Sequence, residues 1–425
     1  MNRSMPGRMK RYLLLACFVA VTSASCPTLQ KPSEAADFEF KPAIAISEEY
    51  TDNLFETPNN KRTEFITRLQ PGFTSRYQTP FWDWNLGYTP EYRRYERNNL
   101  SDTFIHNLNA RGNIALVENF MFLELSDIYR QVPLDVARNN TATENSRVTN
   151  LTEQNNAVIS PYLLWRLKGD NTLKTGYRYT DIRYFDSTGI DNQEHRAFAD
   201  LTHAVTAKFS LTAGYAFTRL DSQTSNFNRQ DLSGGFRYEY SEKSFVFGQI
   251  GNSWQQFDRG GDANYIFWNA GVTHDFNVLV ATAETRVVPT VDPQSVSTKE
   301  TSYSGRLEKT LERGLISFSG SYTQYEYTRT NLIPDRHTLA ISARGRYEVL
   351  QSLTASLTAT GERFSRRSAA DFPYRFTGVA GLSYAFKDEL TLGLTYTYIN
   401  NLRDPNAGAA AYQVNNALLE LKKVF

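Results

Sequence analysis

The sequence predicts an all-β protein, a transmembrane antiparallel up-and-down β-barrel of about 20 strands (18–20). From about residue 38 to residue 425, runs of roughly ten to thirteen residues alternate apolar with polar or small side chains, the two-residue period of a strand. The connections between these runs alternate in length, as in bacterial outer-membrane barrels, which have short periplasmic turns and longer extracellular loops. The 25 Tyr and 27 Phe residues suit strands and interfacial aromatic girdles.

Residues 1–25 are expected to be a secretory signal peptide. Four basic side chains precede a short apolar stretch, and small residues place cleavage after about Ala24 or Ser25. Cys26 follows at once, but Ser23 stands where a lipobox prefers leucine, so ordinary cleavage is favoured over lipid attachment. Residues 26–37 are then a periplasmic segment, and residues 38–425 are the barrel.

Charge and cysteine content exclude several classes of protein. Loss of the signal peptide leaves 42 basic against 45 acidic residues, so no basic excess suggests a nucleic-acid partner. Cys17 leaves with the signal peptide and Cys26 remains alone, which rules out a disulfide framework or a cysteine metal site. No motif for a cofactor occurs, and none is expected. No apolar stretch long enough for a membrane helix follows the N-terminus.

Two strand segments show the alternation clearly. "LTLGLTYTY" at 390–398 and "LTASLTATG" at 353–361 each have one apolar face and one face of hydroxyl side chains and glycine. Several runs exceed the usual five or six residues of soluble strands and match the ten or so that cross a bilayer. We expect the apolar face to meet lipid and the hydroxylated face to line a lumen.

The expected connections give an even number of strands, and both termini are then periplasmic. The short turns fall near 79–81, 117–119, 168–171, 205–206, 242–244, 277–278, 312–314, 350–352 and 387–389. The long loops fall near 51–62, 98–102, 133–155, 186–194, 221–228, 258–263, 292–300, 328–335, 366–373 and 402–412. Loop 133–155 is polar and poor in aromatic residues, which favours disorder over an inward-folded constriction or a docking surface.

A short motif opens the first hairpin. Tyr50, Asp52, Asn53, Leu54 and Phe55 precede the strand "ITRLQPGF". This stretch resembles the β-barrel porin type 2 group, and within it the outer-membrane proteins associated with PEP-CTERM/exosortase systems. The resemblance covers only the first hairpin. It implies a Gram-negative outer-membrane barrel tied to exopolysaccharide secretion or surface-protein sorting, with components of that export system as partners.

A barrel of this size is too wide for side chains to fill, so we expect it to enclose water. Charged residues of both signs lie on the faces opposite the apolar ones and are candidates to line the pore. Such rows can favour polar solutes without selecting one sign of charge strongly, or they can simply brace the wall. The candidates are Lys174, Arg178, Arg237, Glu239, Glu284, Arg286, Arg306, Glu308, Arg344, Arg346 and Glu348.

Two other classes of function compete with the porin-like conduit. A rim-catalytic outer-membrane hydrolase would need a histidine beside an acid, as at Asp335 and His337 or at Asp191, Glu194 and His195. Charged neighbours of a histidine are common in polar loops, so no catalytic residue is assigned and an enzyme is not expected. A non-conducting scaffold or anchor barrel for a periplasmic or surface partner would share every feature described above.

The last residues are expected to form the strand that closes the barrel. In "NNALLELKKVF" one face holds Ala417, Leu419, Leu421 and the terminal Phe425, a pattern that resembles the signal read by the barrel-assembly machinery. Lys423 interrupts this face close to the expected interface, where a long side chain can reach water. We expect this strand to pair with "FEFKPAIAIS" and remove the last open edge of the sheet.

Overall fold

A computed structural model describes residues 36–134, 151–185, 189–291, 293, 297–328, 335–365, 374–402 and 411–425. The chain divides into two units, Met1–Asp37 and Phe38–Phe425, and the second unit is the barrel. The expected signal peptide lies outside the described residues. In the described ranges no helix has the length and apolar character needed to cross a membrane.

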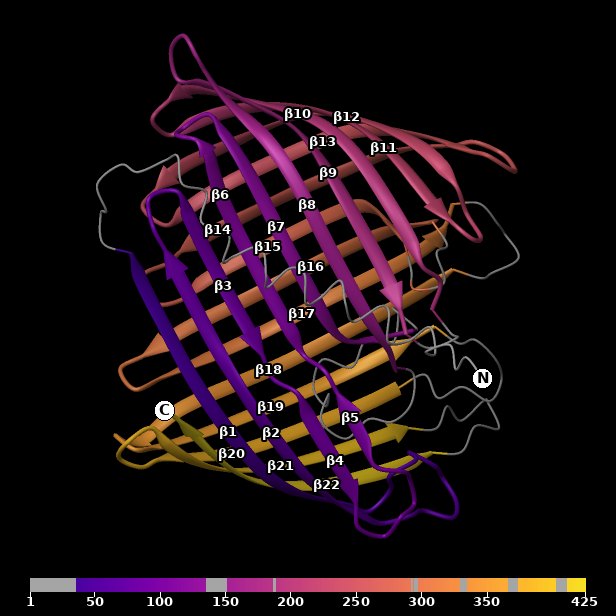
Figure 1. Cartoon of the computed structure of the whole chain (residues 1–425), viewed down its shortest axis with the longest axis vertical. Coiled ribbons are helices and arrows are strands. Elements are labelled where there is room, and N and C mark those ends of the chain that lie inside the picture. The colour runs from indigo at the N-terminus through magenta and orange to yellow at the C-terminus, as the bar shows by residue number, and fades with distance from the viewer. Residues whose placement is uncertain are drawn as a thin grey trace, which may run out of the picture. The chain divides into compact units, whose positions relative to one another are not determined.

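All strands of the described chain belong to one antiparallel sheet (Figure 1). They are β1 (Asp37–Thr51), β2 (Glu64–Gln78), β3 (Trp82–Tyr88), β4 (Glu91–Tyr95), β5 (Thr103–Ile105), β6 (Leu108–Val117), β7 (Met121–Pro133), β8 (Leu151–Leu167), β9 (Asn171–Tyr184), β10 (Asn192–Thr206), β11 (Phe209–Ser222), β12 (Phe227–Ser241), β13 (Ser244–Phe257), β14 (Ala263–Asp275), β15 (Val280–Val291), β16 (Ser297–Leu311), β17 (Gly314–Tyr327), β18 (Arg336–Leu350), β19 (Leu353–Phe364), β20 (Tyr374–Ala385), β21 (Leu390–Leu402) and β22 (Tyr412–Val424).

These 22 strands fill 20 positions in the wall, as the sequence predicts. β3 and β4 both pair with β2, one after the other along its length, so they share one position. β5 and β6 share the next position in the same way, because β4 pairs with β5 and β3 with β6. Pro90 lies between β3 and β4, and a proline cannot donate to the ladder, which explains the interruption there.

The barrel is closed by the first and last strands, as predicted. β1 pairs with β22 antiparallel, from Ala43 opposite Val424 to Thr51 opposite Asn416. The backbone N–H of Phe425 donates a hydrogen bond to the carbonyl oxygen of Pro42 at 2.8 Å. The sheet therefore has no free edge at its two ends.

Eight of the nine short turns lie where the sequence predicts them, and residues with positive φ occur in several. The turn predicted at 205–206 lies instead at 207–208, because β10 continues to Thr206. Asn119 (φ 57°), Gly169 (φ 75°) and Asn277 (φ 65°) adopt the left-handed conformation that glycine and asparagine tolerate best. The loop predicted at 133–155 is shorter, because β8 already begins at Leu151. The first residues of β8 are mostly polar, so a prediction based on apolar alternation placed them in the loop. Residues 135–150 lie outside the described part of the chain.

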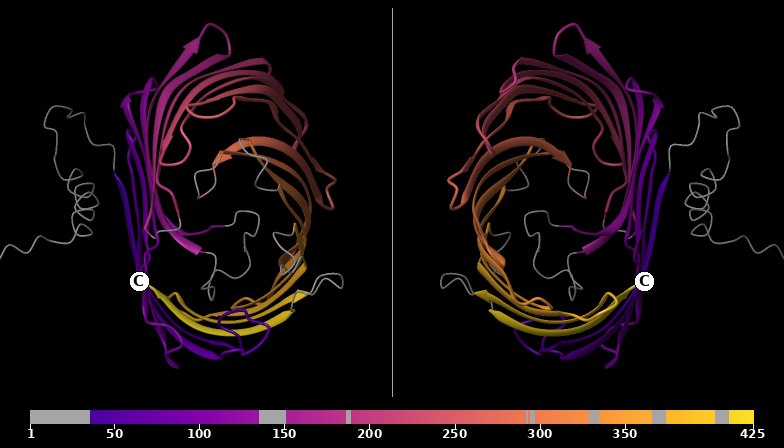
Figure 2. Two further views of the ribbon diagram at one scale, coloured as in Figure 1. Left: turned by 90° about the vertical axis from the view of Figure 1, so that its right-hand side faces the viewer. Right: turned by 90° about the vertical axis from the view of Figure 1, so that its left-hand side faces the viewer.

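The two faces of the sheet differ as expected for a barrel in lipid. On β12, Leu232, Phe236 and Tyr238 alternate along one face and are exposed, while Arg229 and Asp231 lie on the other. Residues directly opposite in an antiparallel ladder share a face, so the register extends this assignment around the barrel. We call the apolar side the outer face and the other the lumen face. Figure 2 shows the strands curving round to form the wall of the barrel.

Candidate functional site: the lumen wall

The strand register places all eleven predicted pore-lining residues on the lumen face. They are Lys174 and Arg178 on β9, Arg237 and Glu239 on β12, Glu284 and Arg286 on β15, Arg306 and Glu308 on β16, and Arg344, Arg346 and Glu348 on β18. Alternation along a strand fixes this placement, since every second side chain of a strand points to the same face.

Four of these residues form ion pairs, and only Arg237 and Glu239 pair with each other on one strand. Arg237 Nε lies 3.1 Å from Glu239 Oε1. Arg286 instead contacts Glu300 of β16 at 2.9 Å. Arg178 contacts both carboxylate oxygens of Glu124, two strands away on β7, at 3.0 and 3.3 Å. Such pairs brace the wall, because each fixes two side chains against the sheet.

Three arginines remain exposed and unpaired. Arg306, Arg344 and Arg346 form no ion pair in the described part of the chain, and all three are exposed. On the strand between them, Ser319 lies opposite Arg306 and Ser317 lies opposite Arg344. Because these serines are short, they leave the arginine side chains exposed to the lumen. We call Arg306, Arg344 and Arg346 the arginine strip.

The wall beside the arginine strip is rich in hydroxyl groups. On β19, Thr354, Ser356, Thr358 and Thr360 are opposite the lumen residues of β18, so they share the lumen face. Ser342 and Thr360 join their hydroxyls at 3.0 Å across this ladder. Hydroxyls both donate and accept hydrogen bonds, so this surface can solvate neutral polar solutes as well as charged ones.

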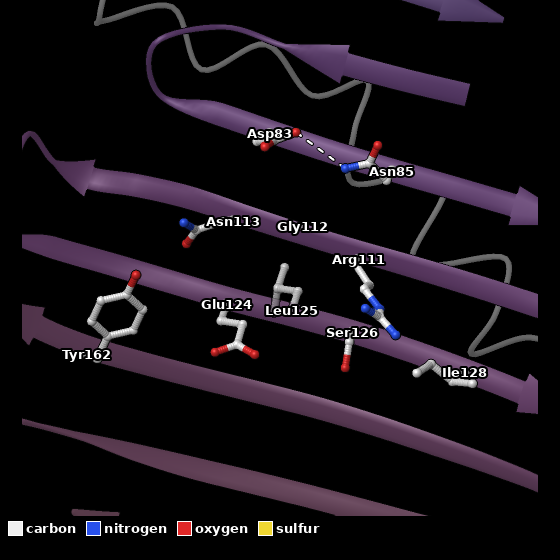
Figure 3. Close-up of a pocket in the computed structure, with 10 residues that line it drawn as sticks. All are labelled: Asp83, Asn85, Arg111, Gly112, Asn113, Glu124, Leu125, Ser126, Ile128 and Tyr162. Atoms are coloured by element: carbon white, nitrogen blue, oxygen red, sulfur yellow. Dashed lines mark hydrogen bonds between the residues drawn. The ribbon is translucent and has the colours of Figure 1, made fainter. Parts of the chain in front are cut away.

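A polar recess lies on the opposite part of the wall (Figure 3). Its volume is about 440 Å³, and β3, β6, β7 and β8 supply the side chains around it. Arg111 and Asn113 of β6 lie opposite Ser126 and Glu124 of β7, so the four share one surface. The complete lining is Asp83, Asn85, Arg111, Gly112, Asn113, Glu124, Leu125, Ser126, Ile128 and Tyr162.

Lys174 is held beside this recess by aromatic rings. Its Nζ lies 4.0 Å from the ring centre of Tyr162 and 5.8 Å from that of Phe198, within the range of cation–π attraction. Gly176 allows this arrangement, because a Cβ there would lie 2.6 Å from Phe198 and 2.8 Å from Tyr162. The ammonium group of Lys174 is therefore a fixed positive charge in the wall.

Sequence reasoning missed a group of deeply buried charges on the lumen face. Glu49 of β1, Arg68 of β2, and Glu91 and Arg93 of β4 are each 6% exposed or less. Arg68 forms ion pairs with Glu49 and Glu91, and Glu91 also contacts Arg93. Gln70 completes this set by donating to Glu91 Oε2 at 2.7 Å. We call the four charged residues the buried charge network.

The histidines considered for catalysis lie on the outer face among aromatic rings. His195 is hydrogen-bonded through Nδ1 to the hydroxyl of Tyr177, and its ring packs against Tyr179. The ring of His337 lies 6.0 Å from that of Tyr322. In the described chain, no group of three or more His, Cys, Asp or Glu side chains could hold a metal ion.

Comparison with known proteins identifies the fold. No family model matches the chain, and no curated protein matches its sequence. Among solved structures, a ferric enterobactin receptor mutant from Pseudomonas aeruginosa (PfeA) in complex with enterobactin is similar with a TM-score of 0.53, 9% identity, and coverage of 92% of this chain and 82% of that one.

Two further solved structures are similar to this chain in fold. The FrpB iron transporter from Neisseria meningitidis has a TM-score of 0.52 at 8% identity, covering 91% of this chain and 82% of that chain. The siderophore receptor PirA from Pseudomonas aeruginosa has a TM-score of 0.50 at 9% identity, covering 93% and 81%. At such low identity the likeness concerns the fold alone. The chain is a large β-barrel of the outer-membrane type.

Proposed function

We propose that this barrel is a porin-like passive conduit for polar solutes across the outer membrane of a Gram-negative bacterium. The observation that supports this most is the arginine strip on a hydroxyl-rich wall, where the charges face the lumen and have no ion-pair partner among the described residues. A barrier to polar solutes would be lowered along such a surface, because its hydrogen bonds and charges replace part of the solute's hydration. No bond is made or broken in this function.

The orientation and assembly belong to the same proposal. The barrel begins with β1 and ends with β22 on the short-turn side, which we assign to the periplasm. The exposed apolar side chains of the outer face contact membrane lipid. The face formed by Leu419, Leu421 and Phe425 serves as the signal for the barrel-assembly machinery. Leu419 and Leu421 are about half exposed on the outer face, so they are accessible before the barrel closes.

The association with exopolysaccharide or surface-protein export rests on the motif at residues 50–55. In the folded protein this motif has a structural task. Asp52 accepts hydrogen bonds from the backbone and side-chain amides of Asn415 at 2.8 and 2.6 Å. Asn53 donates to the carbonyl oxygens of Thr57 and Gln413. The motif thus fastens the first loop to the closing strand, and we propose export-system partners only on the strength of the sequence resemblance.

Two other functions remain as alternatives. A scaffold barrel that conducts nothing would have the same fold, but it gives no reason for unpaired charges in the lumen. A hydrolase would need an acid or base partner for its histidine. The hydrogen bonds of the His106, His195 and His274 rings go instead to tyrosine hydroxyls on the outer face.

The direct test is conductance of the purified full-length protein in planar lipid bilayers. The proposal predicts stepwise insertion events, each adding a constant ohmic conductance. Insertion without conductance, shown by protease protection of the same protein in vesicles, favours the scaffold. Hydrolysis of a peptide or lipid substrate that His337→Ala abolishes would favour the enzyme.

A further inference from the structure

The wall is not uniformly paired, and one seam between neighbouring strands is open over part of its length. The β14–β15 ladder runs from Asp275 opposite Val280 to Trp268 opposite Val287 and stops there. β14 continues to Ala263 along β13, and β15 continues to Val291 along β16. Residues 263–267 and 288–291 therefore face each other across the seam without pairing. Unpaired strand edges are costly in a membrane unless protein covers them.

Near the loop that joins β15 to β16, this hairpin passes on the lumen side of the neighbouring strands. Gln255 of β13 is on the lumen face, yet it exchanges hydrogen bonds with Ser297 of β16 at 2.9 and 3.2 Å. Further along, the N–H of Ile190 donates to the carbonyl of Pro293 at 2.8 Å, although the six strands β10 to β15 lie between them in the chain. Figure 2 shows one end of the orange strands inside the arc of the pink ones.

The faces in contact confirm this overlap. Leu220, Phe227 and Phe257 belong to the lumen face of β11–β13, and Val291 packs against them. By register, Val291 and Ser297 lie on the outer face of their hairpin. An outer face can meet a lumen face only if the hairpin passes inside the wall. The wall thus has two overlapping layers here. Among the described residues they are held together by an apolar cluster, the Gln255–Ser297 hydrogen bonds and the backbone hydrogen bond from Ile190 to Pro293.

An apolar groove on the outer face leads into this seam. Its volume is about 900 Å³, its floor consists of small residues, and large apolar side chains form its walls. On the outer face its floor includes Gly248, Gly305 and Gly320, and its walls include Phe236, Tyr322 and Ile341. Its row of Ala270, Thr285 and Tyr303 is next to the last paired residues of the seam, Trp268 and Val287.

We propose that the β14–β15 seam is a lateral path between membrane and lumen for single-chain amphiphiles. The acyl chain occupies the groove, which faces the hydrocarbon of the bilayer and is almost wholly apolar. The polar head enters between the two layers, where Gln255 and Ser297 meet. Thr301 is on the same face of β16 as Ser297. Movement of the β15–β16 hairpin toward the barrel axis separates the two layers and opens the path. It requires the apolar cluster, the Gln255–Ser297 contact and the backbone hydrogen bond from Ile190 to Pro293 to separate. This path goes beyond the axial conduit and is independent of it.

Occupancy of the groove is tested with a lysophospholipid that carries a photoreactive diazirine in its acyl chain. Gly305→Leu fills the groove, and no atom lies within 4 Å of the added Cβ. Gly345→Leu is the matched control, because its Cβ is equally free and its register partners Ile316 and Leu357 are exposed on the outer face, outside the groove. Adducts located by mass spectrometry should concentrate in the groove and fall several-fold in Gly305→Leu alone. Adducts spread evenly around the outer face, or cross-links to a second copy at the groove, would overturn the proposal.

Opening of the seam is tested by locking it. In a Cys26→Ser background, Gln255→Cys with Ser297→Cys places a disulfide across the two layers. Ser342→Cys with Thr360→Cys provides a control disulfide in an unbroken ladder, where the native hydroxyls are 3.0 Å apart. Transfer of a fluorescent lysophospholipid across proteoliposomes should stop in the first variant, recover on reduction, and persist in the control. Equal transfer in the oxidised and reduced first variant overturns the lateral path, while conductance in the same vesicles reports separately on the axial conduit.

Discussion

Two regions of the lumen wall carry charged side chains, and these side chains differ in burial and in ion pairing between the two regions. In the buried charge network on β1, β2 and β4, every charge has a partner, and Arg68 is only 2% exposed. In the arginine strip on β16 and β18, the guanidinium groups are exposed and have no ion-pair partner in the described chain. The difference separates two roles. Paired and buried charges hold strands together, whereas exposed and unpaired charges are available to a passing solute.

The largest effect is expected from breaking the buried charge network. Arg68→Ala leaves Glu49 and Glu91 buried without their shared cation, which typically costs about 3–5 kcal/mol in the free energy of unfolding. The variant should unfold at lower urea concentration and lose its heat-dependent shift on gels. Arg344→Ala is the matched control and should change the free energy of unfolding by less than about 0.5 kcal/mol. Equal loss of stability in both variants would remove the distinction between the two regions.

The next largest effect is expected from deleting the C-terminal residue, and it concerns the amount of barrel that cells assemble in the outer membrane. Phe425 is 68% exposed and adds one backbone hydrogen bond, to Pro42, so its side chain contributes little to the folded barrel. Deleting Phe425 should leave refolding in detergent nearly unchanged but reduce the amount of barrel in the outer membrane. Membrane fractionation compares the deletion with Phe425→Tyr, which keeps an aromatic end. Normal insertion of the deletion variant would show that Phe425 is not an assembly signal.

A moderate effect on selectivity, without loss of stability, is expected from the arginine strip. Replacing Arg306, Arg344 and Arg346 with glutamine removes three positive charges from the lumen. The pore should become more selective for cations, and the difference from the native protein should shrink as salt rises, because exposed charges are screened. Arg237→Gln is the control at a paired position. A larger change in ion selectivity from Arg237→Gln than from the triple variant would contradict the assignment of solute contact to the arginine strip.

The smallest effect concerns a surface pair outside the membrane. Asp258 follows β13, and its carboxylate accepts two hydrogen bonds of 2.7 Å from Arg219, which lower its pKa below the usual value. A lowered pKa means that this contribution to stability is present above the ordinary aspartate pKa of about 3.9 and is lost as pH falls through the lower folded value. Exchange of the Asp258 amide, bonded to Asn226, should therefore stay slow at pH 4 and quicken below it. Asp258→Asn should remove this pH dependence. The same dependence of amide exchange on pH in the variant would show that the Asp258 carboxylate is not its cause.

Features that depend on the pattern within a single strand could be predicted from sequence. Alternation places Arg306, Arg344 and Arg346 on one face without any knowledge of neighbouring strands. The buried charge network could not be predicted, because it depends on the register that brings Arg68 next to both Glu49 and Glu91. The overlap at β14–β15 depends on where a ladder ends, which alternation does not encode. One local signal was available: Pro289 lies within β15, and proline inside a strand favours a free edge.

The central claim is that the lumen is open and that the arginine strip contacts its solutes. The reversal potential across a planar bilayer with a salt gradient tests this most directly, measured for the native protein and for the triple glutamine variant in parallel. The account predicts ohmic conductance for both proteins and a reversal potential that moves toward the cation equilibrium value in the variant. Inserted protein without conductance, or identical reversal potentials at low salt, would contradict it.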